Sequence, residues 1–268
     1  MTLDSQFSGS IPALYDSCLV PVLFRPYAQN LVARVKDLKP LNVLEIAAGT
    51  GAVSHLLAEV LGRDRVETRI VATDLNPTMI ETAATRGQRS NLSFRVADAL
   101  ALPFESNSFD LVLTQFGAMF YPDKVLAYRE AKRVLTRGGT FLFNVWDRLE
   151  ANPGSAAVHH AVREAVPEPK PDFMARTPFG YCDADTIIKD LRTASFEKIS
   201  VERVGLRSPP ASALRLAKGM CMGSPLANEL ACHPQKLQDA ALAAAGKAAA
   251  AKEPTEGFEM SALVVTAQ

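Results

Sequence analysis

The 268-residue sequence predicts an α/β fold in which helices wind on both sides of a mostly parallel sheet. Between Leu41 and Trp146, short apolar runs alternate with segments of helical periodicity, which is typical of β-α-β units. The runs are continuously apolar, as expected of strands that are covered on both faces. A glycine-rich turn, Gly49-Thr50-Gly51, follows the first run directly. These observations predict a doubly wound sheet with a ligand-binding turn after its first strand.

The central part of the chain is expected to contain five strands that alternate with helices. The expected strands are Asn42–Ala47, Arg69–Thr73, Leu92–Val96, Phe109–Thr114 and Thr140–Val145. The expected helices run from Gly51 to about Leu61, from about Pro77 to Arg86 and over Tyr121–Leu135. Gly138 and Gly139 are expected to form the turn before the fifth strand.

The segments on either side of this core are predicted in less regular terms. Ile11–Val35 is expected to be helical, with breaks near Pro21 and Pro26. Pro153–Pro178 is rich in proline, which predicts a loop with one short helix. The remaining expected elements are a helix over Asp183–Ala194, a sixth strand over Lys198–Leu206, helices over Ala211–Leu230 and Gln235–Lys252, and a last strand over Met260–Thr266.

Composition excludes several classes of function. The 29 basic and 29 acidic residues cancel, and no basic stripe is found, so nucleic acid is not expected as a partner. The four cysteines lack the spacing of a structural zinc site, and no metal site is expected. No run is long and apolar enough for a membrane span, and Met1–Ser10 lacks the pattern of a signal peptide. We therefore expect a soluble, cytoplasmic protein.

The exit of the first strand carries the main functional signal. Glu45 lies within the strand, four residues before Gly49, and Ser54 stands where the dinucleotide-binding pattern G-x-G-x-x-G has its third glycine. A carboxylate at this place suits a cationic ligand better than a pyrophosphate. S-adenosylmethionine (SAM), with its ammonium and sulfonium groups, is such a ligand.

Acidic residues also follow the next two strands. Asp74 ends the second strand, where a carboxylate can accept both hydroxyl groups of a ribose. This position fits SAM and nicotinamide dinucleotides equally well. Asp98 follows the third strand, where it could bind an adenine amino group or, alternatively, cap a loop.

These motifs together resemble the small-molecule class I SAM-dependent methyltransferases, and most closely the ubiquinone/menaquinone C-methyltransferase-like group. The resemblance rests on Glu45 to Gly51, Asp74, Ala97 to Ala99 with Leu102-Pro103-Phe104, Ser108-Phe109-Asp110, and Arg133-Val134-Leu135 before Gly138-Gly139. It covers positions 40 to 150. It implies a Rossmann-like sheet of seven strands whose last strand is antiparallel, a place that Met260–Thr266 fits.

The resemblance also implies the cofactor, SAM with its product S-adenosylhomocysteine (SAH), and the residues that hold it. Glu45, Ala47, Gly49 and Gly51 would line the methionine end. Asp74 would hold the ribose with Leu75 beside it, Asp98 and Ala99 would face the adenine, and Gln115 would lie near the methionine and the acceptor. We expect a single domain, residues 1–268, with a helical N-terminal cap (1–38), a SAM-binding core (40–150) and a variable acceptor-side region with the last strands (151–268).

The expected reaction is an in-line methyl transfer to a small molecule, for which positioning and exclusion of water can supply much of the catalysis. A general base is needed only where the acceptor loses a proton. His159, His160 and Asp147 are the candidates, against the alternatives of exposed histidines and a helix cap. The sequence does not identify the acceptor, the atom that is methylated or the oligomeric state.

The cofactor motifs leave no further cluster of polar or charged residues that could bind a charged acceptor. We therefore expect the acceptor to be apolar. Apolar side chains in Ile11–Val35 suggest that this segment and the region after the sixth strand roof the acceptor as a lid, or else complete the core. Two other functions stay open: a non-catalytic SAM-binding protein and a nicotinamide-dependent oxidoreductase.

Overall fold

The computed structural model describes residue 4, residues 7–63 and residues 68–268. These residues fold into two compact units. The helical unit comprises the described residues of 1–26, 146–181 and 205–262, and the sheet unit comprises those of 27–145, 182–204 and 263–268. The expected organisation as one domain with a cap, a core and an acceptor-side region, and the lid role of the N-terminal helices, stay predictions.

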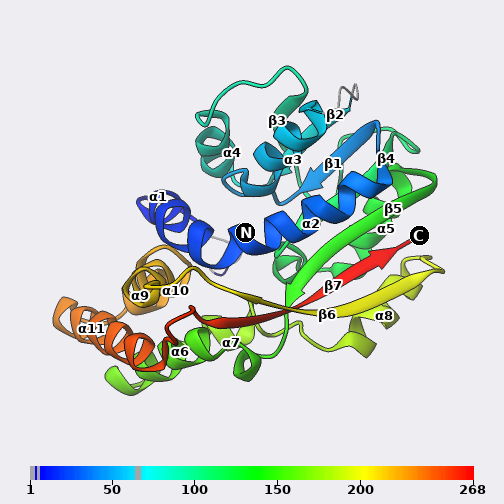
Figure 1. Ribbon diagram of the computed structural model, residues 1–268. Coiled ribbons are helices and arrows are strands. Elements are labelled where there is room, and N and C mark those ends of the chain that lie inside the picture. The colour runs from blue at the N-terminus through cyan, green and yellow to red at the C-terminus, as the bar shows by residue number, and fades with distance from the viewer. Residues whose placement is uncertain (1–3, 5–6, 64–67) are drawn as a thin grey trace. The chain divides into compact units, whose positions relative to one another are not determined.

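A seven-stranded sheet has the order β3-β2-β1-β4-β5-β7-β6 (Figure 1). The strands are β1 Asn42–Ile46, β2 Arg69–Asp74, β3 Leu92–Val96, β4 Phe109–Gln115, β5 Leu135–Trp146, β6 Ile199–Arg207 and β7 Glu259–Ala267. β1 pairs in parallel with β2 and β4, β2 with β3, and β4 with β5. The chain order reverses between β1 and β4, which is the switch point where ligands bind in such sheets. The doubly wound, Rossmann-like sheet predicted from the sequence is confirmed.

The last strand, β7, is antiparallel to its neighbours, as predicted. Lys198 and Gln268 exchange backbone hydrogen bonds at one end of the β6–β7 pair, and Ser208 donates to the Phe258 carbonyl at the other end. From the first of these pairs to the second, the residue number increases on β6 and decreases on β7. The two strands therefore run in opposite directions.

Helices of the sheet unit begin at side-chain caps that the sequence provides. The Asn76 side chain accepts from Thr78 N–H at the start of α4 (Pro77–Ala84), and Asp123 accepts from Leu126 N–H at the start of α5 (Lys124–Val134). Asp183 likewise caps the predicted helix, α8 (Ala184–Thr193), by accepting from Thr186 N–H. The other helices of this unit are α2 (Arg25–Leu38), whose first two residues belong to the helical unit, and α3 (Ala52–Arg63).

The glycine pair Gly138-Gly139 lies inside β5 and not before it. Phe109 pairs with Leu135 and Leu111 pairs with Thr140, so the register shifts across the glycines, and Gly138 has a φ of +81°. The expected turn is therefore present as an irregularity of a strand that begins five residues earlier than predicted.

Two predictions for the helical unit are wrong. Pro153–Pro178 forms two helices, α6 (Pro153–Ala165) and α7 (Phe173–Arg176), and not a loop with one short helix. Pro153 is the first residue of α6, a position where the missing N–H of proline costs no helix bond. Ala211–Leu230 is divided into α9 (Ala213–Met222) and α10 (Leu226–Leu230), because Gly223 and Pro225 interrupt it.

The N-terminal helical segment changes its winding near Pro26, as predicted, but the predicted break near Pro21 is wrong. It comprises α1 (Ile11–Leu14), the π-helix η2 (Tyr15–Phe24) and the start of α2, and Pro21 lies inside η2. The chain therefore passes Pro21 without leaving the helix, while the change of winding at Arg25 lies next to Pro26. The predicted alanine-rich helix is α11 (Gln235–Lys252), and its small residues Ala241, Ala245 and Ala249 are buried against α6 and α9.

Of the described helices, none is long and apolar enough to cross a membrane. The four cysteines, Cys18, Cys182, Cys221 and Cys232, are all free thiols.

Candidate functional site

The loop after β1 turns sharply at the switch point of the sheet. Ala47, Gly49 and Gly51 have φ angles of +54°, +56° and +79°. Ala48 donates its N–H to the Thr73 carbonyl over 2.9 Å, and Gly51 donates to the Ala48 carbonyl over 2.9 Å. A non-glycine residue such as Ala47 adopts this left-handed conformation only where its surroundings enforce it. The loop is therefore a constrained structure, fixed against the end of β2.

The two glycines of the loop have different surroundings, which the sequence could not separate. A Cβ atom placed on Gly49 would meet nothing within 4 Å, so this backbone is open on its side-chain face. A Cβ atom on Gly51 would lie 3.0 Å from Cδ2 of His55 and 3.1 Å from Cβ of Ala83. Gly49 is thus the glycine at which a ligand can approach bare backbone, whereas Gly51 allows close packing against α3 and α4.

Glu45 is buried beneath this loop, and Ser54 of α3 donates its hydroxyl to Glu45 Oε2. Burial raises the pKa of the Glu45 carboxyl to about 8, opposed by the Ser54 hydrogen bond and assisted by the nearby Asp74 carboxylate. The partnership explains why a serine stands at the place of the third glycine: glycine would leave the buried carboxyl without this donor. Sequence reasoning noted Ser54 only as a departure from a pattern.

Asp74 ties the ends of β1 and β2 together. Its Oδ2 accepts the Gly49 N–H over 2.8 Å, and its Oδ1 accepts the Asn76 N–H over 2.8 Å. Burial raises the pKa of Asp74, while these backbone hydrogen bonds oppose the rise. Each oxygen of an ionised carboxylate has a second lone pair, so both can still accept from a pair of ribose hydroxyls. Leu75 beside it is 43% exposed, so its apolar side chain is accessible, and its predicted place beside the ribose stays a prediction.

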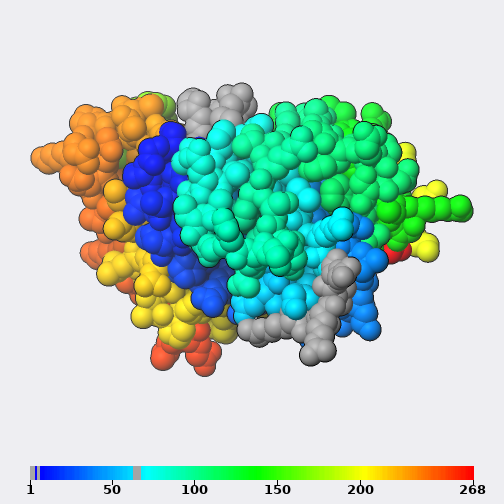
Figure 2. Space-filling view, turned by 90° about the horizontal axis from the view of Figure 1, so that it is seen from above, coloured from blue at the N-terminus to red at the C-terminus, as the bar shows by residue number. Residues whose placement is uncertain are grey.

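The exit of β3 is a tight turn held by Asp98. Oδ1 of Asp98 accepts the Leu100 N–H over 2.9 Å, and its carbonyl accepts the Ala101 N–H over 3.1 Å. One carboxylate oxygen of Asp98 therefore caps the loop, which was the alternative to adenine binding. The Asp98 side chain is exposed, whereas Ala99 is buried. The segment that follows β2, including α4 and β3 (cyan to teal), lies on the surface in Figure 2. An adenine-binding role of Asp98 stays a prediction.

An ion pair on α5 holds the loop that follows Asp98. Arg133 donates to the Phe104 carbonyl over 2.8 Å and to the Leu102 carbonyl over 2.9 Å. Glu130 accepts the Leu102 N–H over 2.9 Å and pairs with Arg133 at 2.7 Å. The two motifs around Leu102 and Arg133, which are separate in the sequence, are therefore one structural unit that supports the exit of β3.

The exit of β4 lies next to that of β1 and is also constrained. Phe116 has a φ of +52°, and its N–H is shared between the Asn144 carbonyl (3.1 Å) and Asn144 Oδ1 (3.0 Å). A Cβ atom on Gly117 would lie 2.6 Å from Cβ of Ala47, so glycine is required where the two exits meet. Gln115, predicted near the methionine and the acceptor, is the last residue of β4. Sequence reasoning missed Asn144 and Gly117.

The cofactor-binding candidates all lie in the sheet unit, and the three candidates for a general base all lie in the helical unit. His159 and His160 are neighbours on α6, not in a loop. His160 is exposed and His159 is buried. The alternative that both histidines are exposed is therefore correct for His160 and wrong for His159. Burial lowers the pKa of His159, and the nearby Arg163 guanidinium adds to this effect, while the carboxylates of Asp172 and Glu229 oppose it.

Asp147 has a structural role at the end of β5. Its Oδ1 accepts the Arg148 N–H over 2.8 Å, and its Oδ2 accepts the Ser261 hydroxyl over 2.9 Å. Its own N–H donates to the Ser261 carbonyl over 3.1 Å. Asp147 therefore fastens the end of β5 to β7, and a role as a base stays a prediction.

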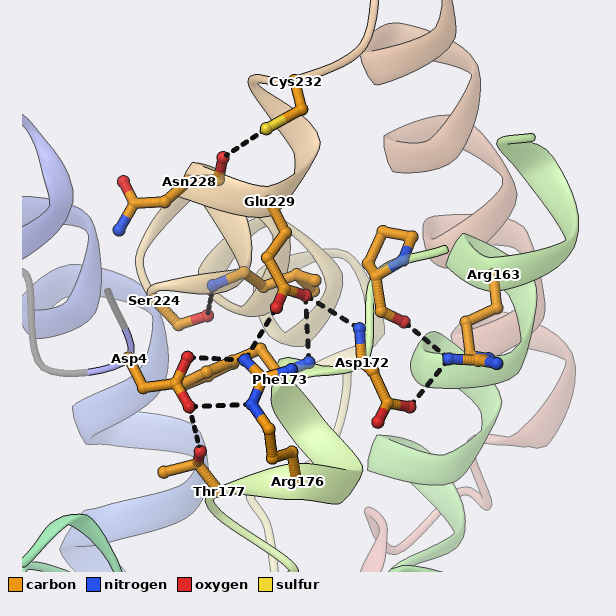
Figure 3. Close-up of polar contacts among 12 residues, drawn as sticks. Asp4, Arg163, Asp172, Phe173, Arg176, Thr177, Ser224, Asn228, Glu229 and Cys232 are labelled. Atoms are coloured by element: carbon orange, nitrogen blue, oxygen red, sulfur yellow. Dashed lines mark hydrogen bonds and ion pairs between the residues drawn. The ribbon is translucent and has the colours of Figure 1, made fainter. Parts of the chain in front are cut away.

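A further charged cluster in the helical unit is internally paired (Figure 3). Arg176 donates to Asp4 from Nε at 3.0 Å and Nη2 at 2.5 Å, and to Glu229 at 2.8 Å. Oε2 of Glu229 also accepts the Asp172 N–H and the Phe173 N–H, at 2.8 and 2.9 Å, and so caps the start of α7. These ion pairs and hydrogen bonds connect Asp4, α7 and α10. We therefore interpret the cluster as structural.

The model of a methyltransferase domain family matches residues 44–143, which contain the exits of β1, β2, β3 and β4. Residues 44–143 are thus similar in sequence to methyltransferase domains. This confirms the predicted resemblance to the class I SAM-dependent methyltransferases. It also supports SAM as the cofactor.

Curated relatives agree with this assignment over part of their length. The ubiquinone/menaquinone biosynthesis C-methyltransferase of Brucella canis is 40% identical over 111 residues, which are 40% of this chain and 40% of that protein. The protein of the same name from Sinorhizobium fredii is 36% identical over 134 residues, or 48% of this chain and 51% of that protein. The match thus spans about half or less of the relatives' length.

A solved structure shares the fold of this chain. The phosphoethanolamine N-methyltransferase 2 of Haemonchus contortus, in complex with phosphomonomethylethanolamine and SAH, has a TM-score of 0.62 and 16% sequence identity. The similarity covers 100% of this chain and 61% of that protein. At this identity it shows the fold and not the substrate.

Replacing Asp74 by asparagine is expected to weaken SAH binding tenfold to a hundredfold, about 1.5–3 kcal/mol, because a charged acceptor for the ribose is removed. Calorimetric titration with SAH measures this. Asp110→Asn is the matched control, since Asp110 accepts two backbone N–H groups, of Leu41 and Asn42, near the opposite end of the strands. The control should retain SAH affinity within about twofold. Equal losses in the two variants would mean that Asp74 acts only on the fold.

The two loop glycines are expected to respond in opposite ways to substitution. Gly49→Ala puts a methyl group on the open face and should weaken SAH binding more than tenfold, at a stability cost of about 1 kcal/mol for its left-handed backbone. Gly51→Ala should lower the free energy of unfolding by about 2–3 kcal/mol, since it adds crowding against His55 and Ala83 to the same strain. Urea unfolding and SAH titration of both variants give the comparison. The reverse pattern would assign the ligand-facing backbone to Gly51.

Proposed function

We propose that this chain is a SAM-dependent methyltransferase that transfers a methyl group to a small, largely apolar organic acceptor. The observation that carries the proposal is the loop after β1, where open Gly49 backbone lies between the buried Glu45 carboxyl and the Asp74 carboxylate. The family match over residues 44–143 supports it.

The residues at the strand exits fit this cofactor. SAM, when bound, supplies a methyl group that its sulfonium centre activates for transfer. Gly49 would bind the methionine end with its backbone, and Asp74 would hold the ribose. Leu75 and Ala99 would flank the adenine, and Asp98 would accept from its amino group with the oxygen that the turn leaves available.

The acidic character of the site favours SAM over a dinucleotide. A pyrophosphate at the start of α3 would approach the Asp74 carboxylate, and like charges at short range repel. A ligand with an ammonium and a sulfonium group is instead attracted by Asp74, and a cation beside Glu45 would favour the ionised form of that buried carboxyl. We therefore prefer a methyltransferase to a nicotinamide-dependent oxidoreductase.

The finer proposal concerns the acceptor. The relatives from Brucella canis and Sinorhizobium fredii are named as C-methyltransferases of ubiquinone and menaquinone biosynthesis. We infer that the acceptor of this chain belongs to the same chemical class, an oxygen-substituted aromatic ring that is methylated at carbon. Such a carbon loses a proton during the reaction, and His159, His160 and Asp147 stay the candidates for the base.

Turnover with labelled SAM tests this function. The purified chain is incubated with radiolabelled SAM and 1,4-dihydroxynaphthalene under reducing conditions, and the extracted product is analysed by mass spectrometry. We expect a product heavier by one methyl group on carbon, and at least a tenfold loss of the rate with Asp74→Asn at limiting SAM. Binding of SAH without turnover of any aromatic acceptor would favour the non-catalytic alternative.

A further inference from the structure

Asn144, near the end of β5, is fully buried and has an amide group with a fixed orientation. Its Oδ1 accepts the Phe116 N–H over 3.0 Å. Because an N–H group must meet an oxygen, this bond places the carbonyl side of the amide toward Phe116 and the NH₂ side away from it. Across the part of the chain that the structure describes, no group accepts a hydrogen bond from Asn144 Nδ2. A buried donor in this state costs free energy and calls for an explanation.

Strand register puts Asn144 on the same face of the sheet as the cofactor residues. Asn144 pairs with Gln115, and Glu45 pairs with Leu113 two residues earlier on β4. Neighbours in register share a face, so Glu45, Gln115 and Asn144 all lie on the face that Ser54 of α3 covers at β1. The opposite face is apolar here. Its Phe141 and Phe143 pack against Tyr128 of α5.

The order of the strands indicates which ligand lies near this donor. The ribose partner Asp74 is on β2, the methionine loop follows β1, and β4 and then β5 come next in the sheet. Adjacent strands are about 4.8 Å apart, so the end of β5 lies about 10 Å from that of β1, on the side away from the adenosine. With SAM over β1 to β3, the space near the end of β5 belongs to the methyl acceptor.

We propose that Asn144 Nδ2 donates a hydrogen bond to an oxygen atom of the methyl acceptor and thereby selects an apolar ring that carries a hydroxyl or carbonyl group. This inference rests on the proposed function. A site built to hydrogen-bond a substrate oxygen rejects an analogue that lacks it, because the buried group is then left without a partner. Asn144 is thus a specificity residue of the acceptor site.

The test compares two ligands that differ only in oxygen. Dissociation constants of 1,4-dihydroxynaphthalene and naphthalene are measured by equilibrium dialysis with the SAH-loaded protein under reducing conditions. The wild type should bind the dihydroxy compound at least tenfold more tightly, because one buried hydrogen bond contributes a difference of this size to the affinity. Asn144→Leu should reduce this preference to less than threefold while SAH affinity stays within twofold. Leucine is close in size, and Phe116 N–H keeps its bond to the carbonyl of residue 144.

Thr140→Val is the matched control. Thr140 is buried on the same strand and face as Asn144, and its hydroxyl is paired with Gln268 at 3.1 Å. It lies about 13 Å from Asn144 along the strand, and the variant should keep the wild-type preference. If thermal melting shows that Asn144→Leu does not fold, Asn144→Ala replaces it with the same expectation.

Four results would overturn the inference. Equal binding of the two compounds by the wild type, or an unchanged preference in the Asn144 variant with SAH bound normally, would overturn the role of Asn144 alone. Loss of the preference in Thr140→Val as well would assign the effect to the fold of β5. Failure of the wild type to bind SAH would overturn the proposed function, and the inference with it.

Discussion

Gly49 donates its backbone N–H to the Asp74 carboxylate over 2.8 Å, and this bond joins the exit of β1 to the exit of β2. The other features of the site depend on it. It holds Gly49 in a left-handed conformation with its open face exposed, and it fixes the carboxylate that would receive the ribose. The same loop covers Glu45, which the Ser54 hydroxyl supports from α3. A charge-assisted hydrogen bond of this kind orders the loop before any ligand arrives, so less entropy is lost on binding.

A second constraint is the division of the sheet into an apolar and a polar face at its carboxyl edge. On one face the aromatic side chains Phe141 and Phe143 of β5 pack against Tyr128 of α5, which fixes β5 against this helix. On the other face, Glu45, Gln115 and Asn144 lie at or near the ends of three neighbouring strands, β1, β4 and β5. Rigid strands position these groups more accurately than loops would. The strained backbones of Ala47 and Phe116 lie at the two exits that flank the switch point, where ligands bind in this fold.

Much of this arrangement could be predicted from the sequence, since it follows from local patterns. The apolar runs gave the positions of the strands, Asp183 marked the start of α8, and the terminal run Met260–Thr266 predicted the antiparallel β7. The spacing of Glu45 and Asp74 relative to the strand ends indicated a site for SAM. Proline content misled the prediction for Pro153–Pro178, because a proline that begins a helix differs from one that breaks it only by its position.

The rest depends on contacts between distant residues, which no local pattern reveals. Ser54 is needed because Glu45, nine residues earlier, is buried beneath it. Gly49 and Gly51 differ only in what faces them, and the role of Asn144 appears only when β4 and β5 are placed in register. Calorimetric titration of the wild-type chain with SAH and, separately, with NAD⁺ tests the central claim most directly. The account predicts that one SAH binds per chain and that NAD⁺ gives no binding heat at the same concentrations. Binding of NAD⁺ without binding of SAH would contradict it.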